Sequence, residues 1–380
     1  MEQRKKRGFG RNMLLAGMLG ASGLALAGCD VTPPGGAVGK FLRMGWPEGI
    51  TPEATEVGNF WVWVWVTAWT IGIIMWALML WNVFFNTAKR AKKAGKGELP
   101  KQLQYNIPLE IVLTIIPITI VSVLFFFTVQ AQDQVNALDK NPKVTVDITG
   151  FQWNWKFGYA NVAADLSPTG QDYVGTDEAR TKAAEESAYE RDADGNIKTK
   201  HLPNGEEYQW GGPVHGKSRD DRSYLHFNKI ETVGASNEVP VLVLPSQTPL
   251  EFRLASADVS HSFWVPEFLF KRDVYANPEA NNSVNRFQIE KIEEEGAFVG
   301  RCAEMCGTYH AMMNFEVRVV SPEKFKQYLE YRTANPEAPN SEALKAIGED
   351  PYSTSTRPFL TERDGTRGIE SNTFDYAANK

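Results

Sequence analysis

Two long apolar runs near the N-terminus constrain this chain most, because about 20 consecutive apolar residues are enough to span a bilayer as a helix. The first run, residues 60–85, contains six of the eleven tryptophans, and the second covers residues 107–129. As a helix, the first run would be about 39 Å long, enough to cross a membrane with some tilt. Tryptophans near its ends suit the membrane interface. The runs predict a two-helix transmembrane hairpin over residues 60–130.

Charges around the hairpin predict its orientation. The loop between the runs carries six Lys and Arg against Glu98 alone, and short basic loops remain in the cytoplasm. Residues 1–28 have a basic start, an apolar run too short to span a membrane and the ending "LAGC". This pattern is typical of a secretory signal peptide with a lipobox, which predicts a lipid anchor at Cys29. Both signals place residues 29–59 and everything after residue 130 outside the cytoplasm, at the cell membrane.

After Pro142 the pattern changes to short alternating runs. They are "KVTVDITG", "FQWNWKFGY", "VPVLVLP", "LEFRLAS", "HSFWVP", "VNRFQIE", "GAFVGRC" and "NFEVRVV". In the second run, alternate positions from Phe151 to Tyr159 are aromatic, which predicts a single aromatic strand face. Short strands separated by turn residues predict a β-sandwich or barrel over residues 131–322.

Two segments depart from the β pattern. Residues 161–236 are polar and lack sustained apolar periodicity, so we expect a surface insertion that is partly disordered. Residues 323–380 are expected to form a helix capped by Ser321 and then, from about Asn335, an extended tail.

The charge distribution indicates which kinds of partner the outer domain can bind. The whole chain has a net charge of −6, and its first 130 residues hold thirteen Lys and Arg against seven Asp and Glu. The remaining residues therefore carry −12. An acidic outer domain repels nucleic acid and favours a basic protein partner, although the same charge also serves solubility.

The segment "GRCAEMCGTYHAMMNF" gathers Cys302, Cys306, His310 and Met313. A disulfide is possible in an oxidising compartment, but it would leave the histidine and the methionine unexplained. Zinc could use the two cysteines, His310 and His261, although methionine is not among its usual ligands. Copper suits thiolate, thioether and imidazole together. A Cys–His–Met loop with one distant histidine is the ligand set of cupredoxins, and a second inward-facing thiolate would allow two coppers to be bridged.

The spacing Cys302-x-Glu304-x-Cys306-Gly307-x-x-His310-x-x-Met313 resembles the binuclear copper (CuA) motif of cytochrome c oxidase subunit II. The segments "SADVSHSFWVP" and "GFQWNWKF" are similar to that family's distant-histidine segment and aromatic patch. The resemblance implies a membrane-anchored all-β fold, with an N-terminal two-helix transmembrane hairpin followed by a cupredoxin-like β-sandwich. The lipobox, the insertion and the long tail resemble those of Gram-positive bacterial members of this family.

The resemblance also implies residue roles. His261 and His310 would each bind one of two copper ions, and Cys302 and Cys306 would bridge them as thiolates. Met313 and the carbonyl of Glu304 would complete the ligand set. The Glu304 side chain would reach a magnesium ion at the boundary with subunit I.

The resemblance also implies roles for residues that are not copper ligands. Trp153 would receive electrons, Trp155 would pack against the site, and Glu110 would lie near the mouth of a proton path into subunit I. Met312 is expected in the core. The family's usual residues are replaced at four positions that are not metal ligands, namely Leu113, Phe151, Asn154 and Asn314.

The function implied is electron transfer from a c-type cytochrome, soluble or membrane-tethered, to haem in subunit I, where oxygen is reduced to water and protons are pumped. Subunits I and III and membrane lipid are the other expected partners. Two alternatives come from different classes. Subunit II of a quinol oxidase would lack the copper ligands, and a copper-delivery or storage lipoprotein would not need the hairpin and the aromatic patch.

Overall fold

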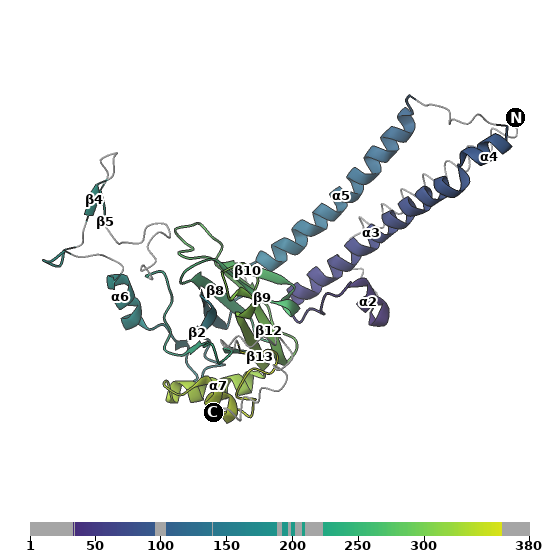
Figure 1. Ribbon diagram of the computed structural model, residues 1–380. Helices are drawn as coiled ribbons and strands as arrows, with labels where there is room; N and C mark the ends of the chain where they lie inside the picture. Colours follow the sequence, from purple (N-terminus) through teal and green to yellow (C-terminus); the bar gives the residue numbers. More distant parts are fainter. Residues whose placement is uncertain are drawn as a thin grey trace, which may run out of the picture. The chain divides into compact units, whose positions relative to one another are not determined.

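The computed structural model describes residues 33, 35–95, 104–138, 140–187, 192–196, 199–201, 207–209 and 223–358. The described residues fall into two compact units. Figure 1 labels most of their helices and strands. One comprises the residues up to Gly45 together with 61–95, and the other comprises 46–60 and the described residues from 104 onward. The predicted signal peptide, Cys29 and the centre of the basic loop lie outside the described residues.

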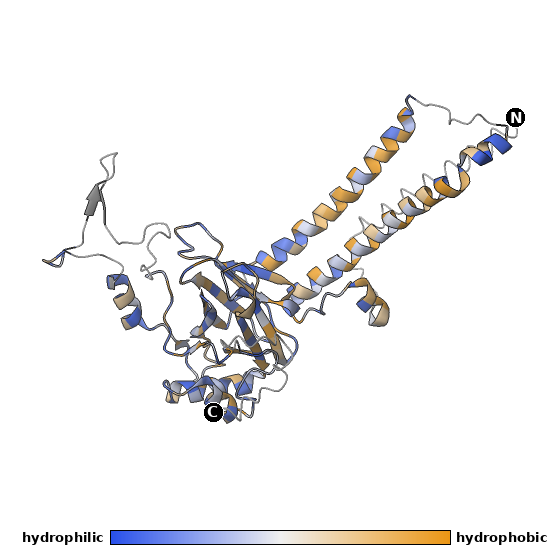
Figure 2. Cartoon of the chain, viewed as in Figure 1, coloured by the Kyte–Doolittle hydropathy of each residue, from blue (hydrophilic) through white to orange (hydrophobic). Residues whose placement is uncertain are grey.

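The first unit is helical. It contains α2 (Gly36–Leu42), most of α3 (Pro52–Phe85) and the short basic helix α4 (Ala88–Lys93). The second unit begins with the first turns of α3 and includes α5 (Ile107–Asn136). Apolar side chains are exposed along both long helices, which are mostly coloured as hydrophobic in Figure 2. Both helices are long and apolar enough to cross a membrane, as predicted.

Both long helices extend past their apolar runs, so the predicted hairpin limits of 60 and 130 were too narrow. α3 begins at Pro52, where the Thr51 hydroxyl accepts a hydrogen bond from Ala54 N at 3.1 Å and caps the helix. α5 continues through polar residues to Asn136. Hydropathy alone could not reveal these ends, because a helix can continue into polar sequence where caps and tertiary contacts support it.

A buried ion pair fastens the start of α3 to the β-domain. The Glu53 side chain is 2% exposed and lies 3.3 Å from Lys140 Nζ. Its Oε1 also accepts a hydrogen bond from Glu290 N at 2.9 Å. Just before the helix, Ile50 donates its N–H to the Glu267 carbonyl and accepts one from Glu293. The start of α3 is therefore joined to three parts of the second unit that are distant in sequence, at Lys140, at Glu267 and at 290–293.

The β-domain consists of two main sheets. The first has the order β11-β8-β1-β2-β3, with β6 also paired to β2, and the second has the order β10-β9-β12-β13-β7. The strands of the first sheet are β1 (Val144–Phe151), β2 (Asn154–Val162), β3 (Tyr173–Val174), β6 (Glu231–Val233), β8 (Leu250–Ser256) and β11 (Arg286–Ile289). Those of the second are β7 (Val241–Pro245), β9 (His261–Val265), β10 (Phe270–Val274), β12 (Gly296–Cys302) and β13 (Asn314–Val320).

Aromatic side chains from both sheets meet in one core. The ring of Phe252 on β8 lies 6.0 Å from that of Phe263 on β9, and Phe263 stacks on Phe315 of β13 at 4.7 Å. Trp155 of β2 contacts Phe315 edge-on at 5.3 Å. Such interdigitation between facing sheets defines a sandwich, as predicted. Each predicted alternating run forms a strand, whereas β3, β6 and β10 were not predicted.

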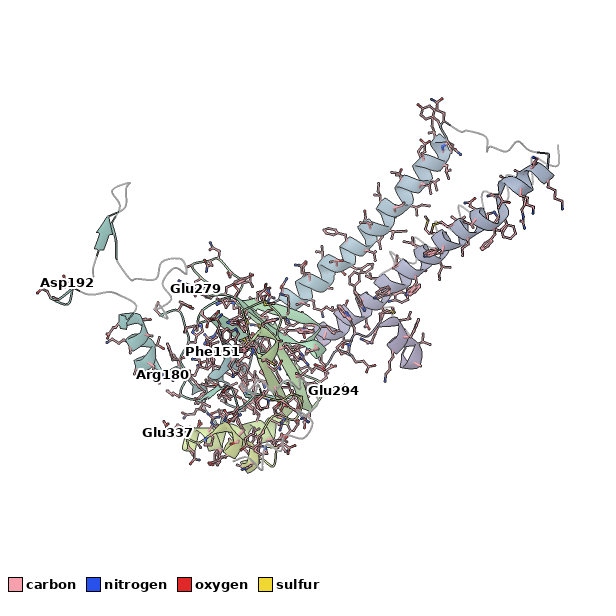
Figure 3. The ribbon with its side chains drawn as sticks, in the orientation of Figure 1. Phe151, Arg180, Asp192, Glu279, Glu294 and Glu337 are labelled. Atoms are coloured by element: carbon pink, nitrogen blue, oxygen red, sulfur yellow. The ribbon has the colours of Figure 1, made fainter. Side chains whose placement is uncertain are left out.

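The predicted aromatic face is interrupted at its start. β1 ends at Phe151, which is labelled in Figure 3, and β2 begins only at Asn154. Trp153 therefore lies in the turn and is half-buried, whereas Trp155 is fully buried in the core. Periodicity could not show this, because the turn pairs Phe151 with Asn154 and Gly150 with Trp155, which puts Phe151 and Trp155 on opposite faces of the sheet.

The segment 161–236 is less separate from the sandwich than predicted. Its ends belong to the first sheet through the last residues of β2, through β3 and through β6. Asn228 inserts above Gly158, where a Cβ atom would lie 2.0 Å from Asn228 Oδ1, and its amide donates to Asp147 Oδ2 at 2.9 Å. Between these ends lie α6 (Glu178–Ser187) and the hairpin of β4 (Thr199–His201) and β5 (Glu207–Gln209).

The prediction of an extended tail from Asn335 was wrong for the residues up to 358. After α7 (Pro322–Ala334), capped by Ser321 as predicted, the chain forms α8 (Asn340–Ala346), in which Leu344 is fully buried. The next residues cover β13, where the buried Glu316 carboxylate accepts hydrogen bonds from Thr354 N at 2.7 Å and Ser355 N at 2.8 Å. Polar sequence suggested an exposed arm, but its polar groups satisfy a buried carboxylate instead.

Candidate metal centre

Adjacent strands of the second sheet bring the predicted ligands together. His261 is the first residue of β9, and Cys302 is the last residue of β12. These strands pair with Cys302 opposite Phe263, and the Ala303 N–H donates to the Ser262 carbonyl at 3.0 Å. The chain then loops through Cys306 and the 3-10 turn η2 (His310–Met312) before β13. Strand register thus holds the distant histidine beside the first cysteine.

The two thiols form the centre of the cluster. Their sulfur atoms are 3.8 Å apart, His261 Nδ1 lies 3.9 Å from Cys302 Sγ, and His310 Nδ1 lies 3.6 Å from Cys306 Sγ. Met313 Sδ is 3.9 Å from Cys306 Sγ. Each thiol therefore has one imidazole beside it, and the thioether completes one side of the cluster.

The geometry separates the disulfide from the two metal chemistries considered for the thiols. A disulfide requires sulfur atoms about 2.05 Å apart, so the Cys302–Cys306 pair is reduced here, and both cysteines are free. The ligand atoms of His261, Cys302 and Cys306 all lie within 4.8 Å of one another, which suits a shared metal ion. The Glu304 carbonyl oxygen lies 3.2 Å from Cys302 Sγ and supplies an additional oxygen at the edge.

Electrostatics also favour a cation at the thiols. Burial raises the pKa of the Cys306 thiol, and the charge of a neighbouring Cys302 thiolate raises it further. At Cys302 burial acts in the same direction, but hydrogen bonds with His261 and with nearby backbone outweigh it and lower the pKa. One thiolate thus forms readily and opposes the second. Two thiolates can coexist at this distance when positive charge lies between them, and a soft metal ion supplies it.

Asp258 is a contact of the cluster that sequence analysis missed. Its Oδ1 lies 2.8 Å from His261 Nε2, the ring nitrogen that faces away from Cys302. Burial lowers the pKa of His261, but the hydrogen bonds with Asp258 and Cys302 raise it overall. A carboxylate behind a metal-binding imidazole is a frequent arrangement, so the Asp-x-x-His spacing of "DVSH" was a usable signal.

Two tryptophans bracket the cluster. Trp155 is fully buried, and its indole N–H donates to the Met313 carbonyl at 3.2 Å, as its predicted packing role requires. Trp153 donates its indole N–H to the Cys306 carbonyl at 3.1 Å, and its ring meets Tyr309 edge-on at 4.9 Å. The close approach depends on Gly307, where φ is +119° and a Cβ atom would lie 3.1 Å from the Trp153 indole nitrogen.

The remaining predicted residues have mixed outcomes. Met313 is fully buried, but Met312 is 43% exposed, so the expected core role of Met312 was wrong. The turn η2 rotates adjacent residues to different sides, which the sequence could not show. The Glu304 side chain is 45% exposed and lies 3.9 Å from Lys271 Nζ. Glu110 is far in sequence from the residues of the cluster. It lies at the start of α5, where its carboxylate accepts a hydrogen bond from Asn106 N.

A surface depression of about 280 Å³ adjoins the cluster. Its wall includes Trp153, Tyr309 and Met312 from the cluster side, and Glu238 and Pro358 from elsewhere in the β-domain. The depression therefore connects solvent to the indole that contacts the Cys306 carbonyl.

Comparison with known proteins bears on this arrangement. Residues 223–320 match the family model described as "Cytochrome C oxidase subunit II, periplasmic domain". Cytochrome c oxidase subunit 2 of Corynebacterium diphtheriae is 67% identical over 363 residues, covering 96% of each chain. The chain belongs to the cytochrome c oxidase subunit 2 family. The Mycobacterium tuberculosis member is 48% identical over 366 residues, covering 95% of this chain and 93% of its own.

Membership of the subunit 2 family makes the chain part of a haem-copper oxidase. Two apolar helices followed by a cupredoxin-like β-domain fit that family, which implies copper of the CuA type. The periplasmic domain of subunit II of cytochrome oxidase from Bradyrhizobium japonicum is a similar solved structure. It is 20% identical, with a TM-score of 0.28, and the match covers 51% of this chain and 96% of that one.

Proposed function

We propose that this chain accepts electrons one at a time from a c-type cytochrome at a binuclear copper centre and passes them to haem in subunit I. There oxygen is reduced to water and protons are pumped. The observation that carries the proposal is the pair of thiols 3.8 Å apart with one histidine beside each. A single-copper site would need only one of the cysteines.

The family resemblance supplies the proposed ligand set, and the distances support it. Cys302, Cys306, His261 and His310 would hold the two ions. Met313, whose sulfur lies 3.9 Å from Cys306 Sγ, and the Glu304 carbonyl, 3.2 Å from Cys302 Sγ, would complete the set. Two bridged copper ions would share one unpaired electron, so that oxidation and reduction change the site's geometry little.

The surrounding chain supports that small change by holding the ligands rigidly. His261 and Met313 are fully buried, and the thiols are nearly so. The Cys302 N–H donates to the Met313 carbonyl at 3.1 Å, and Trp155 donates to the same carbonyl. Groups held by several hydrogen bonds and close packing have little freedom to relax when charge changes.

We propose Trp153 as the residue through which electrons arrive. Its indole contacts the Cys306 carbonyl and borders the surface depression, so it connects a site for a donor to a proposed copper ligand. The acidic outer domain favours a basic soluble cytochrome, whose association would weaken as salt screens exposed charges. A tethered donor would depend less on salt, because its effective concentration is already high.

Several finer assignments are extensions of the same proposal. The Glu304 side chain is proposed to reach magnesium at the boundary with subunit I, and Glu110 to lie near the mouth of a proton path. For Glu110 the hydrogen bond from Asn106 N supports a competing role in capping α5. Subunit III is proposed as a further partner. The copper domain is proposed to lie outside the cell membrane, with a lipid anchor at Cys29 and residues 1–28 removed as a signal peptide.

Rapid mixing of the oxidised enzyme with reduced c-type cytochrome tests this function. We expect the copper absorption to bleach first and haem in subunit I to be reduced afterwards, at a rate that matches the recovery of the copper band. Direct reduction of haem without a transient at the copper centre would contradict the proposal. Reduction by a quinol in place of the cytochrome would favour the quinol-oxidase alternative.

A further inference from the structure

Asp258 links two parts of the metal centre that are far apart in sequence. Its side chain is 30% exposed, whereas the imidazole of His261 beside it is completely buried. Oδ1 faces His261 Nε2 at 2.8 Å and also accepts the Val259 N–H at 2.7 Å. Oδ2 accepts the N–H of Gln152 at 2.7 Å. Both carboxylate oxygens are therefore occupied, and the carboxylate position is fixed by backbone on two sides.

This arrangement defines the state of the His261 ring. A carboxylate accepts hydrogen bonds, so the Nε2 nitrogen facing it carries the proton. The lone pair of the neutral ring is then on Nδ1, which faces Cys302. A fixed carboxylate behind an imidazole also increases the electron density that the ring donates to a metal.

Gln152 extends the contact to the other side of the centre. While its backbone N–H binds Asp258, its side-chain amide donates to the Cys306 carbonyl at 2.8 Å. The same carbonyl accepts the indole N–H of Trp153 at 3.1 Å. A continuous set of hydrogen bonds thus runs from His261 through Asp258 and Gln152 to the loop that holds Cys306.

We propose that Asp258 is a positioning residue for the metal centre, which orients the His261 imidazole towards Cys302 and, through Gln152, fixes that imidazole relative to the Cys306 loop. The inference rests on the proposed copper function. It differs from a purely structural role because the negative carboxylate also stabilises the more positively charged, oxidised centre. Its removal should therefore raise the reduction potential.

Asp258→Asn in the full chain, purified within its oxidase, tests the proposal. The amide preserves the size of the side chain, but it removes the charge and presents an N–H where the Gln152 N–H needs an acceptor. We expect the copper reduction potential to rise. We also expect magnetic-resonance couplings from His261 to change while those from His310 stay as in the wild type.

Asp273→Asn is the matched control. Asp273 lies opposite Ser262 in the β10–β9 pairing and binds Lys271 and Tyr275, so its loss removes the same charge close to His261 without touching the ring. The proposal is overturned if Asp258→Asn matches the wild type, if it matches Asp273→Asn, or if both histidines change equally. Loss of copper from Asp258→Asn alone supports it, and loss from both variants contradicts it. A wild-type enzyme without the binuclear signal would instead overturn the proposed function.

Discussion

Trp155→Phe should destabilise the β-domain strongly. Trp155 is fully buried between Phe263 and Phe315, and its indole N–H is bonded to the Met313 carbonyl. Phenylalanine leaves a cavity of about 40 Å³, which costs about 1 kcal/mol at roughly 24 cal/mol per Å³. The Met313 carbonyl retains the Cys302 N–H and so stays satisfied, and the lost indole hydrogen bond contributes its ordinary net value of about 0.5–1.5 kcal/mol. The total is about 1.5–2.5 kcal/mol.

Trp153→Phe is the matched comparison. Trp153 is only half-buried, and the Cys306 carbonyl that it contacts also accepts a hydrogen bond from the Gln152 side chain at 2.8 Å. Phenylalanine therefore leaves neither a closed cavity nor an unsatisfied carbonyl. We expect a loss of less than about 1 kcal/mol, the range of an ordinary partly exposed hydrogen bond.

The assay is urea unfolding of the metal-free, reduced outer domain, residues 136–380, followed by tryptophan fluorescence and circular dichroism. Metal is excluded so that the free energy of unfolding reports packing alone. An equal loss in the two variants, or a larger loss for Trp153→Phe, would refute the burial and hydrogen-bond reasoning given for Trp155.

Three other predictions concern pH, topology and electron arrival. Burial lowers the pKa of His226 below 6.5, so the stability it contributes is complete above that pH and is lost as pH falls through its folded pKa. The unfolding free energy of His226→Gln should therefore fall less than that of the wild type between about pH 7 and about pH 5, and parallel curves would disprove this. An impermeant thiol reagent applied to intact cells should label Ala193→Cys but not Ala94→Cys, both being exposed positions; the reverse pattern would overturn the orientation. Trp153→Phe should slow reduction of copper by a c-type cytochrome with copper content unchanged, and an unchanged rate would remove its assigned role.

The sequence located the proposed ligands but not the groups that position them. Cys302, Cys306, His310 and Met313 lie within twelve residues, and their spacing alone indicated soft-metal chemistry. Asp258 and Gln152 act through contacts between the ends of different strands, and such contacts depend on register. The spacing of the family motif selected Met313 over Met312 as a ligand, but only the geometry of η2 showed that Met312 is exposed.

The fold, like the metal site, could be predicted from the sequence only in part. Alternation of apolar residues identified the long strands, because the face of each strand that points into the sandwich core is apolar. It missed β3 and β6, which are two and three residues long, and β10, whose three central residues are charged. It also missed the packed segment after α7. In that segment Ser353, Thr354 and Ser355 satisfy the buried Glu316 carboxylate. Polar residues that serve a buried charge have the composition of an exposed arm, so composition could not distinguish the two.

The copper content of the outer domain tests the central claim most directly. After reconstitution with copper, residues 136–380 of the wild type should hold two copper ions per chain and show the spectrum of a pair that shares one unpaired electron. Cys302→Ser should lose that shared signal, because the sulfur atom 3.8 Å from Cys306 Sγ is needed for the second bridge. One copper per wild-type domain, or zinc bound in its place after copper reconstitution, would contradict the account.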